Sequence, residues 1–255
     1  MPKETVTVKP SKKDKSAASE TILHVILGTK GGVGKSTYAV HLADWFASLE
    51  IPHKLLDMDD ENATLARFFP AAERRNSRKL TEKDSLVTEF AESGQYALVL
   101  ADLRAGSGDE MLDWFKDVPF DYLAEKGIKF VCHGSVTSDP DSVSTLINWA
   151  NAIGDAVKYV VVKNYKDGNE IPALDRTEEG EEFLRQFTPA IIQLQAVPTA
   201  IMSLLNARNL SFGNALNTTE QIRGVNDSMM RGRLARWQKE IFAQFAAHTD
   251  LLLGV

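Results

Sequence analysis

The sequence predicts an α/β fold, a doubly wound, mostly parallel β-sheet with helices on both faces. Three observations support this. Short apolar runs alternate with longer segments of helical periodicity from residue 21 onward. The runs are almost uninterrupted, as is typical of parallel strands buried on both faces. A glycine-rich segment stands between the first run and the first helix. With 255 residues, 44% of them hydrophobic, residues 21–255 are expected to form a single domain.

The apolar runs give the expected strands in order: 22–27, 54–57, 97–101, 128–132, 157–162 and 191–194. The helix after the first strand carries Ala39, Ala43, Phe46 and Leu49 at helical spacing, so this face is expected to pack on the sheet while Asp44 points to solvent. Ligands of such sheets bind beyond the carboxyl ends of the strands. A site built from several strand ends is therefore expected.

Charge and composition limit the function. Residues 1–20 are rich in lysine and poor in large apolar side chains, which predicts a flexible basic tail. The net charge of −6 means that any binding to nucleic acid depends on a local basic patch. Cys132 is the only cysteine, which excludes an intramolecular disulfide and a cysteine-cage metal site. No apolar run reaches the ~18 residues of a membrane span, so we expect a cytoplasmic protein without membrane contact.

The glycine-rich segment, KGGVGKST over residues 30–37, has the composition of a phosphate-binding loop. Its glycines let backbone N–H groups point at a polyphosphate, and Lys35 would lie against the terminal phosphates. The Ser36 hydroxyl would bind Mg²⁺. The alternative is a strand-to-helix turn that binds nothing. The expected nucleotide contacts in this segment are Lys30, Gly31, Gly32, Val33, Gly34, Lys35, Ser36 and Thr37.

The same segment departs from the common loop because Thr29 replaces its first glycine and Lys30 precedes the paired glycines. In this it resembles the deviant phosphate loop of the ParA/MinD family of P-loop ATPases, which position or segregate DNA and other cargo. The resemblance implies that ATP binding drives formation of a homodimer and that Lys30 reaches the partner's phosphates. A solvated loop lysine is the alternative.

Carboxylates follow two of the expected strands. The segment from Asp57 to Thr64 resembles the first switch of that family, which implies that Asp59 positions or polarises the attacking water. Asp60 and Glu61 replace the family's usual Pro-Gln, and an acidic solvated loop is the alternative. Asp102 ends an apolar strand and resembles the Walker B aspartate. The expected Mg²⁺ site comprises Ser36, Asp59 and Asp102.

Other candidate site residues follow the third and later expected strands. Arg104 is expected to form a surface ion pair with Asp109 or Glu110, although contact with phosphate or a partner is open. Family resemblance implies that Asn164 reads the adenine edge, with a turn-forming asparagine as the alternative. Resemblance also implies that the segment around Pro198 backs the base. Because Lys163-Asn164 does not match the guanine-specific motif, ATP is expected rather than GTP.

A local basic segment lies late in the chain. Residues 208–239 carry six Arg or Lys against two acids, a net of 6 − 2 = +4. Partition ATPases of the family bind DNA non-specifically with late basic residues, so Arg231, Arg233 and Arg236 are candidate DNA contacts. A solvated helix face is an equal alternative. The residues after 240 carry apolar side chains but no Lys or Arg, which indicates packing on the domain rather than on a membrane.

Three function classes follow. The first is a ParA-like ATPase, stimulated by a partner protein, that positions or segregates DNA or other cargo and is nucleoid-associated if it binds DNA. The second is a nucleotide-switched accessory ATPase of conjugative transfer, secretion or polysaccharide export with a protein client. The third is a small-molecule ligase or kinase. Lys30 argues against the third, since a lysine acting on a partner subunit is useful only in a nucleotide-sandwich dimer.

Overall fold

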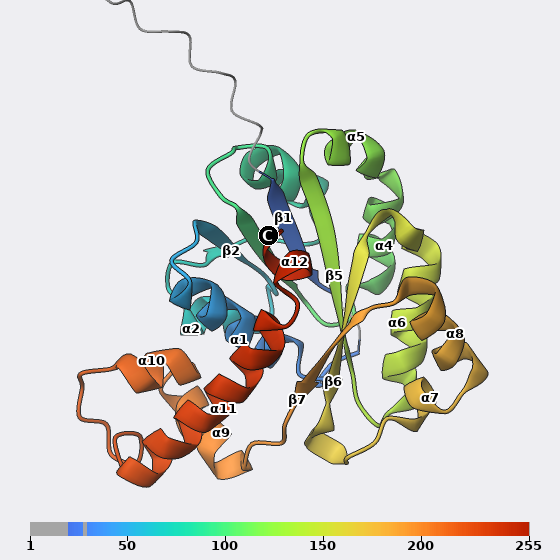
Figure 1. The fold of residues 1–255 in the computed structure, drawn as a ribbon. Coiled ribbons are helices and arrows are strands. Elements are labelled where there is room, and N and C mark those ends of the chain that lie inside the picture. The colour runs from blue at the N-terminus through green and yellow to red at the C-terminus, as the bar shows by residue number, and fades with distance from the viewer. Residues whose placement is uncertain (1–19, 28–29, 255) are drawn as a thin grey trace, which may run out of the picture.

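A computed structural model describes residues 20–27 and 30–254. Its centre is a seven-stranded sheet whose ladders are all parallel (Figure 1). From edge to edge the strands are β3 (Glu73–Arg74), β2 (His53–Met58), β4 (Leu98–Leu103), β1 (Thr21–Ile26), β5 (Ile128–Val136), β6 (Lys158–Asn164) and β7 (Ala190–Leu194). β1 lies between β4 and β5, where the strand order reverses. In doubly wound sheets a ligand binds at this switch point, beyond the carboxyl ends of the strands.

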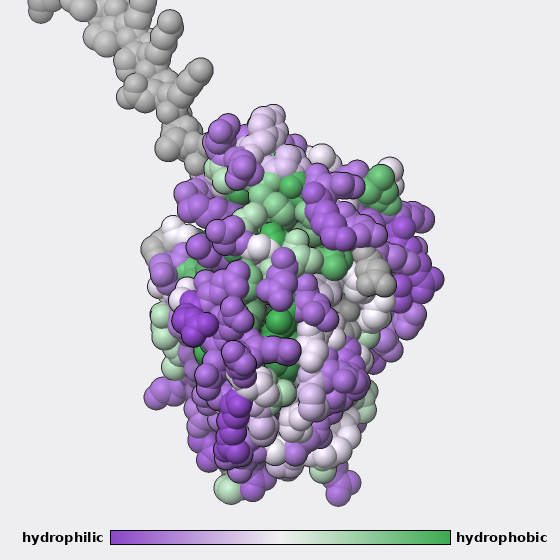
Figure 2. Space-filling view, turned by 90° about the vertical axis from the view of Figure 1, so that its right-hand side faces the viewer, coloured by the Kyte–Doolittle hydropathy of each residue, from purple (hydrophilic) through white to green (hydrophobic). Residues whose placement is uncertain are grey.

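Helices cover both faces of the sheet, which confirms the predicted doubly wound fold (Figure 1). The first face is covered mainly by α1 (Lys35–Ser48), α2 (Thr64–Phe68), α11 (Ser228–Ala246) and α12 (Thr249–Leu253). The opposite side carries α3 (Leu80–Ser85), the π-helical turn η1 (Leu86–Ala91), α4 (Gly108–Asp117), α5 (Phe120–Glu125), α6 (Pro140–Ile153), α7 (Pro172–Asp175) and α8 (Glu178–Phe187). Seen from the side of α4 to α8, the surface is predominantly hydrophilic (Figure 2).

The strands predicted from apolar runs are all present, with ends that differ by a few residues. Every residue of β1 and β4 is buried, because each of these central strands has helices on both sides. β3 was not predicted. It contains only Glu73 and Arg74, and two charged residues carry no apolar period.

A smaller helical layer stands beside the loop after β1. It contains α9 (Thr199–Ala207), α10 (Phe212–Asn217) and the first half of α11, packed around their own apolar cluster. The buried members include Leu205, Phe212 and Leu234. This layer lies at the lower left of Figure 1, against α1. It therefore flanks the ligand side of the sheet.

The structure corrects the predicted orientation of α1. Ala39, Ala43 and Phe46 are buried as expected, but Leu49 is 39% exposed. Asp44 was predicted to face solvent and is instead buried, at 6% exposure. Its carboxylate accepts hydrogen bonds from the Ser211 hydroxyl at 2.6 Å and from the backbone N–H of residue 213 at 2.9 Å. The prediction was wrong because the helical layer covers this face of α1 and supplies donors to the carboxylate.

A row of buried hydrogen bonds joins the sheet to the C-terminal helix. Tyr38 Oη lies 2.9 Å from His133 Nδ1, and His133 Nε2 lies 3.0 Å from His24 Nδ1. His24 Nε2 lies 3.1 Å from the carbonyl oxygen of Leu252 in α12, an atom that only accepts. His24 therefore donates to Leu252, His133 donates to His24, and Tyr38 donates to His133. The last helix is thus fixed to the sheet, as the apolar pattern after residue 240 predicted.

The expectation for Cys132 can be compared with the structure, whereas that for the N-terminal tail cannot. Cys132 is fully buried in the core, where burial raises the pKa of its thiol. The predicted tail over residues 1–20 lies outside the described residues except for Glu20. Across residues 20–27 and 30–254, none of the helices is both long and apolar enough to cross a membrane.

Candidate functional site

The site is built around the turn that links β1 to α1. Gly32 and Gly34 have φ values of +75° and +92°, in the region that glycine adopts without steric cost. A Cβ on Gly34 would lie 2.2 Å from Nδ2 of Asn164, so this position also needs the missing side chain for space. Val33 is buried and fixes the turn to the domain. The N-terminus of α1 follows at Lys35, where helix N–H groups favour anions.

The two loop lysines have different surroundings. Lys35 is buried, and its Nζ donates to the Lys30 carbonyl at 2.8 Å. Burial lowers the pKa of Lys35, while the charges of Asp102 and Asp59 act in the opposite direction. The Lys30 side chain is 41% exposed, and its Nζ lies 2.6 Å from Asp139 Oδ2 and 3.0 Å from Asp141 Oδ2.

The carboxylates that hold Lys30 come from the start of α6. Asp139 is the N-cap of this helix, and its side chain accepts a hydrogen bond from the N–H of Asp141. The ion pair raises the pKa of Lys30 and lowers that of Asp139. Sequence analysis did not identify these partners. The signal was the Asp-Pro-Asp segment at residues 139–141, shortly after an apolar strand, which is typical of a helix start.

Asp57, Asp59 and Asp102 lie together at the carboxyl ends of β2 and β4. Asp57 and Asp102 are register partners on these neighbouring strands. Asp57 accepts hydrogen bonds from the N–H groups of Asp59 and Ala66, so it organises the segment after β2. Asp59 accepts from the N–H groups of Glu61 and Asn62 and from the Asn62 amide. In this conformation Asp59 therefore also anchors the switch-like segment.

Asp102 differs from the other two because neither of its carboxylate oxygens has a hydrogen-bond partner among the described residues. The side chain is fully buried. Burial raises its pKa to about 7; the charges of Asp57 and Asp59 act in the same direction, whereas the nearby Ser36 hydroxyl and the charge of Lys35 oppose the shift. A buried carboxylate without a partner is costly unless a cation or donor neutralises it. Together with Ser36 and Asp59, Asp102 therefore offers the hard oxygen donors that fit Mg²⁺ and its bound waters.

Arg104 joins the segments after β2 and β4. Its guanidinium lies 3.6 Å from Glu110, 3.7 Å from Glu61 and 4.0 Å from Asp60. Of the two expected partners, Glu110 is thus confirmed, whereas the Asp109 side chain lies outside the described residues. The expectation of a surface pair was wrong, since the Arg104 side chain is only 14% exposed. The Cβ of Ala105, the next residue, lies 3.8 Å from the position that a Cβ on Gly31 would occupy. The segment after β4 therefore lies against the glycine-rich loop.

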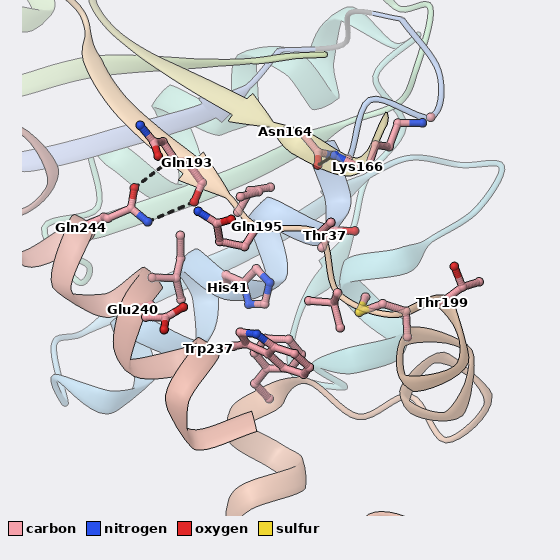
Figure 3. A pocket seen from close by; sticks show the side chains of 18 residues that line it. Thr37, His41, Asn164, Lys166, Gln193, Gln195, Thr199, Trp237, Glu240 and Gln244 are labelled. Carbon is pink, nitrogen blue, oxygen red and sulfur yellow. Dashed lines mark hydrogen bonds between the residues drawn. The ribbon is translucent and has the colours of Figure 1, made fainter. Parts of the chain in front are cut away.

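A cavity of about 280 Å³ opens beside the loop, between the ends of β6 and β7 and the helices α9 and α11 (Figure 3). Asn164 lines it, and its Nδ2 donates to the Val33 carbonyl at 2.9 Å. Asn164 Oδ1 accepts from the N–H of Lys166. Asn164 therefore holds the phosphate loop from the side. Pro198 is exposed and precedes α9, and the cavity is lined by its neighbours Val197 and Thr199.

The basic candidates lie on α11 in different environments. Arg231 donates from Nη2 to the Leu216 carbonyl at 2.6 Å, which ties α11 to α10. Arg233 is exposed. Arg236 is exposed and lies 3.8 Å from Glu240, one turn later. The structure therefore leaves Arg233 and Arg236 on the surface and gives Arg231 a structural contact.

The sheet topology, the glycine loop at the β1–α1 turn and the acidic strand ends define a P-loop nucleotide-binding protein. The family model of the CobQ/CobB/MinD/ParA nucleotide-binding domain matches residues 24–231. The chain belongs to this family, and the predicted ParA/MinD-type recognition is confirmed. Comparison with curated proteins finds no match.

Two structures of MinD among the similar solved structures support the fold. The MinC:MinD cell division protein complex of Aquifex aeolicus is similar over 89% of this chain and 95% of that chain, with 14% identity and a TM-score of 0.53. MinD of the same organism is similar over 88% and 97%, with 14% identity and a TM-score of 0.50. A ParA family ATPase of Chlorobium tepidum TLS aligns over 88% and 99%, with 10% identity and a TM-score of 0.49. The fold is therefore that of nucleotide-binding ATPases of the ParA/MinD type.

Proposed function

We propose that this protein is an ATP-driven switch that binds Mg-ATP at the loop, closes into a homodimer around the nucleotide and hydrolyses it slowly. The observation that carries the proposal is the convergence of Lys35, Asp59 and a partnerless, buried Asp102 on the glycine loop. One ammonium group, from Lys35, and two carboxylates, from Asp59 and Asp102, thus lie next to the N-terminus of α1. This arrangement suits a polyphosphate accompanied by a divalent cation.

Each residue has a part in the proposed hydrolysis. Lys35 leaves its bond to the Lys30 carbonyl and contacts the terminal phosphates. Ser36, Asp59 and Asp102 would hold Mg²⁺ and its bound waters, and the ion would supply positive charge beside the terminal phosphates. Asp59 orients the attacking water and accepts its proton as the bond between the γ-phosphorus and the bridging oxygen breaks. ADP and phosphate are the products.

Lys30 is the residue that couples nucleotide binding to dimer formation in this proposal. In the single chain it is held by Asp139 and Asp141 at the exposed mouth of the site. An exposed ion pair is weak and breaks readily. In the proposed dimer, Lys30 exchanges these carboxylates for the phosphates bound to the other subunit. The family resemblance of KGGVGKST supports this role.

The cargo proposed for the switch is DNA, bound without sequence preference by the ATP dimer, which would place the protein on the bacterial nucleoid. Arg233 and Arg236 are exposed on α11 and are free of backbone contacts in the described residues. A protein client, as in conjugative transfer, secretion or polysaccharide export, is the second candidate. The net charge of −6 and the pairing of Arg236 with Glu240 favour it. In either case an activating partner protein is proposed to stimulate hydrolysis.

Dimer formation is tested by sedimentation of the Asp59→Ala variant with Mg-ATP. We expect this variant to retain ATP and accumulate as a dimer, whereas Lys35→Ala loses ATP binding. Lys30→Ala is expected to bind ATP as a single subunit. Lys79→Ala, at an exposed lysine of another segment, is the matched control. A hydrolysis-blocked, ATP-loaded protein that sediments as one subunit at micromolar concentration contradicts the proposal.

DNA binding is tested by anisotropy of a labelled duplex of arbitrary sequence. We expect binding only with ATP and a loss of affinity in the double variant Arg233→Ala/Arg236→Ala. Each lost phosphate contact should reduce the slope of log affinity against log salt by about one. Arg185→Ala, at an exposed arginine on α8, is the control. Equal binding by the double variant and the control would favour a protein client.

A further inference from the structure

We propose that the purine ring of the bound nucleoside triphosphate stacks on Trp237 of α11. This inference rests on the nucleotide binding proposed above and identifies the residue that holds the base. It assigns a ligand contact to the long helix α11, which carries the candidate DNA residues. Stacking uses the π-face that every base has.

Continuity of the cavity with the phosphate loop is the first support. Gly32, Gly34 and Thr37 of the loop line the same cavity as Trp237. Figure 3 shows Asn164 near the loop at one end, Trp237 at the opposite end, and His41 between them. A ligand with its phosphates on the loop therefore extends toward α11 through space that the fold already provides.

The chemistry of the far end is the second support. Phe212, Met202 and Ile241 line the cavity together with Trp237, and the ring of Phe212 lies beside that of Trp237. Burial lowers the pKa of His41 to about 4, so its imidazole is neutral near pH 7. The lining around Trp237 is mostly aromatic and apolar, which suits a flat ring with an apolar face; the Arg236 guanidinium lies 5.8 Å from the centre of the Trp237 ring, and Glu240 also lines the cavity. The base, rather than the triphosphate, fits this end.

The ring of Trp237 is also fixed in place. Its centre lies 6.1 Å from that of Phe212, with 29° between the ring planes. About two turns further along α11, Gln244 accepts from the N–H of Gln193 at 2.7 Å and donates to its carbonyl at 3.0 Å. This pair of bonds ties α11 to β7. A fixed aromatic ring loses little freedom when it receives a base, which favours binding.

Polar groups stand along the side of the cavity. Glu240 and Gln195 line it, and Figure 3 shows them on one side, between Trp237 and the sheet. A carboxylate accepts hydrogen bonds, and an amide both accepts and donates. These side chains are therefore suited to the edge of a purine whose face lies on Trp237.

The fluorescence of Trp237 itself can report on base stacking. The chain has four tryptophans, and Trp45, Trp114 and Trp149 are buried at 3%, 5% and 3% exposure. Trp237 is partly exposed and alone among the four lines the cavity. A base stacked on it should quench the intrinsic fluorescence. Titration with Mg-ATP is expected to give this change, Trp237→Phe to remove it, and Trp149→Phe to preserve it.

Affinity provides the second readout. Trp237→Leu keeps apolar packing but has no π-face, so calorimetry should show ATP binding about tenfold weaker. Inorganic tripolyphosphate, which has no base, should bind this variant and the wild type equally. Thermal unfolding of each variant checks that α11 remains packed.

The outcomes separate this inference from the function on which it rests. Calorimetric ATP binding by the wild type without a fluorescence change, or wild-type ATP affinity in Trp237→Leu, overturns the stacking and leaves the switch in place. Equal weakening of ATP and tripolyphosphate in Trp237→Leu also overturns it, because the effect would then lie in the loop. No calorimetric binding of ATP to the wild type overturns the nucleotide switch and the stacking with it.

Discussion

Replacing Asp102 with asparagine is expected to stabilise the nucleotide-free protein above neutral pH and to remove its stabilisation by Mg-ATP. The carboxylate is fully buried, and neither oxygen has a hydrogen-bond partner among residues 20–27 and 30–254. Burial raises its pKa from 3.8 to about 7. Ionising Asp102 in the nucleotide-free protein therefore opposes folding, whereas the proposed Mg²⁺ site uses the same charge.

The expected change in the free energy of unfolding follows from the shift in the pKa of Asp102. A rise from 3.8 to about 7 corresponds to about 4 kcal/mol at full ionisation, at about 1.36 kcal/mol per pKa unit. Because the folded-state pKa is raised, this penalty is absent below about pH 4, where Asp102 is protonated in both states, grows as the pH rises and is complete above about pH 7. A buried amide without partners costs about 1–3 kcal/mol. The net gain of Asp102→Asn above pH 7 is therefore about 1–3 kcal/mol.

Urea unfolding of both proteins between about pH 5 and about pH 8.5 measures this effect. The free energy of unfolding of Asp102→Asn minus that of the wild type should increase with pH. Other buried acids such as Asp44, whose pKa burial raises to about 6, contribute equally to both proteins and cancel. Asp121→Asn, at an exposed acid, is the control. A difference that does not change with pH, or an Asp102→Asn protein that gains as much stability from Mg-ATP as the wild type, would refute the reasoning.

Three further predictions concern the loop and its neighbours. Gly34→Ala should destabilise the protein by about 1–3 kcal/mol, since its Cβ meets Asn164 and its φ is positive; thermal unfolding should therefore show a lower midpoint, and an unchanged midpoint would contradict the clash. Asp139→Asn should weaken the restraint on Lys30, which keeps only the exposed Asp141, and should allow ATP-dependent dimers at lower protein concentration with little change in stability. The same sedimentation profile as the wild type would show that the Asp139 ion pair does not restrain Lys30. Arg104→Ala should speed amide hydrogen exchange in the segment after β2, because the nearby carboxylates lose their shared cation; unchanged exchange would exclude this role.

Much of the fold could be predicted because its signals are local. Apolar runs such as that of β4 reveal a strand buried on both faces without reference to any other segment. The glycines of the loop are needed for its own backbone conformation, with φ of +75° at Gly32 and +92° at Gly34. Asp59 and Asp102 could be assigned to one site because parallel strands end at the same edge.

The errors and omissions involve contacts between distant segments. Asp44 was predicted to face solvent, yet Ser211 and its neighbours, 167 or more positions away, bury it and bond its carboxylate. Arg104 was expected on the surface and is enclosed by acids from two segments. The period of a helix shows which residues share a face, but it does not show how many layers cover the helix.

The sequence by itself determined the class of fold, the loop and the acids that face it, because these depend on backbone conformation and on residues within one strand or turn. Only the tertiary structure decided which carboxylates hold Lys30 and which helix closes the cavity beside the loop. Trp237 enters that cavity from a segment 200 positions after Thr37. Packing of distant helices sets such a contact, and no local pattern of residues encodes it.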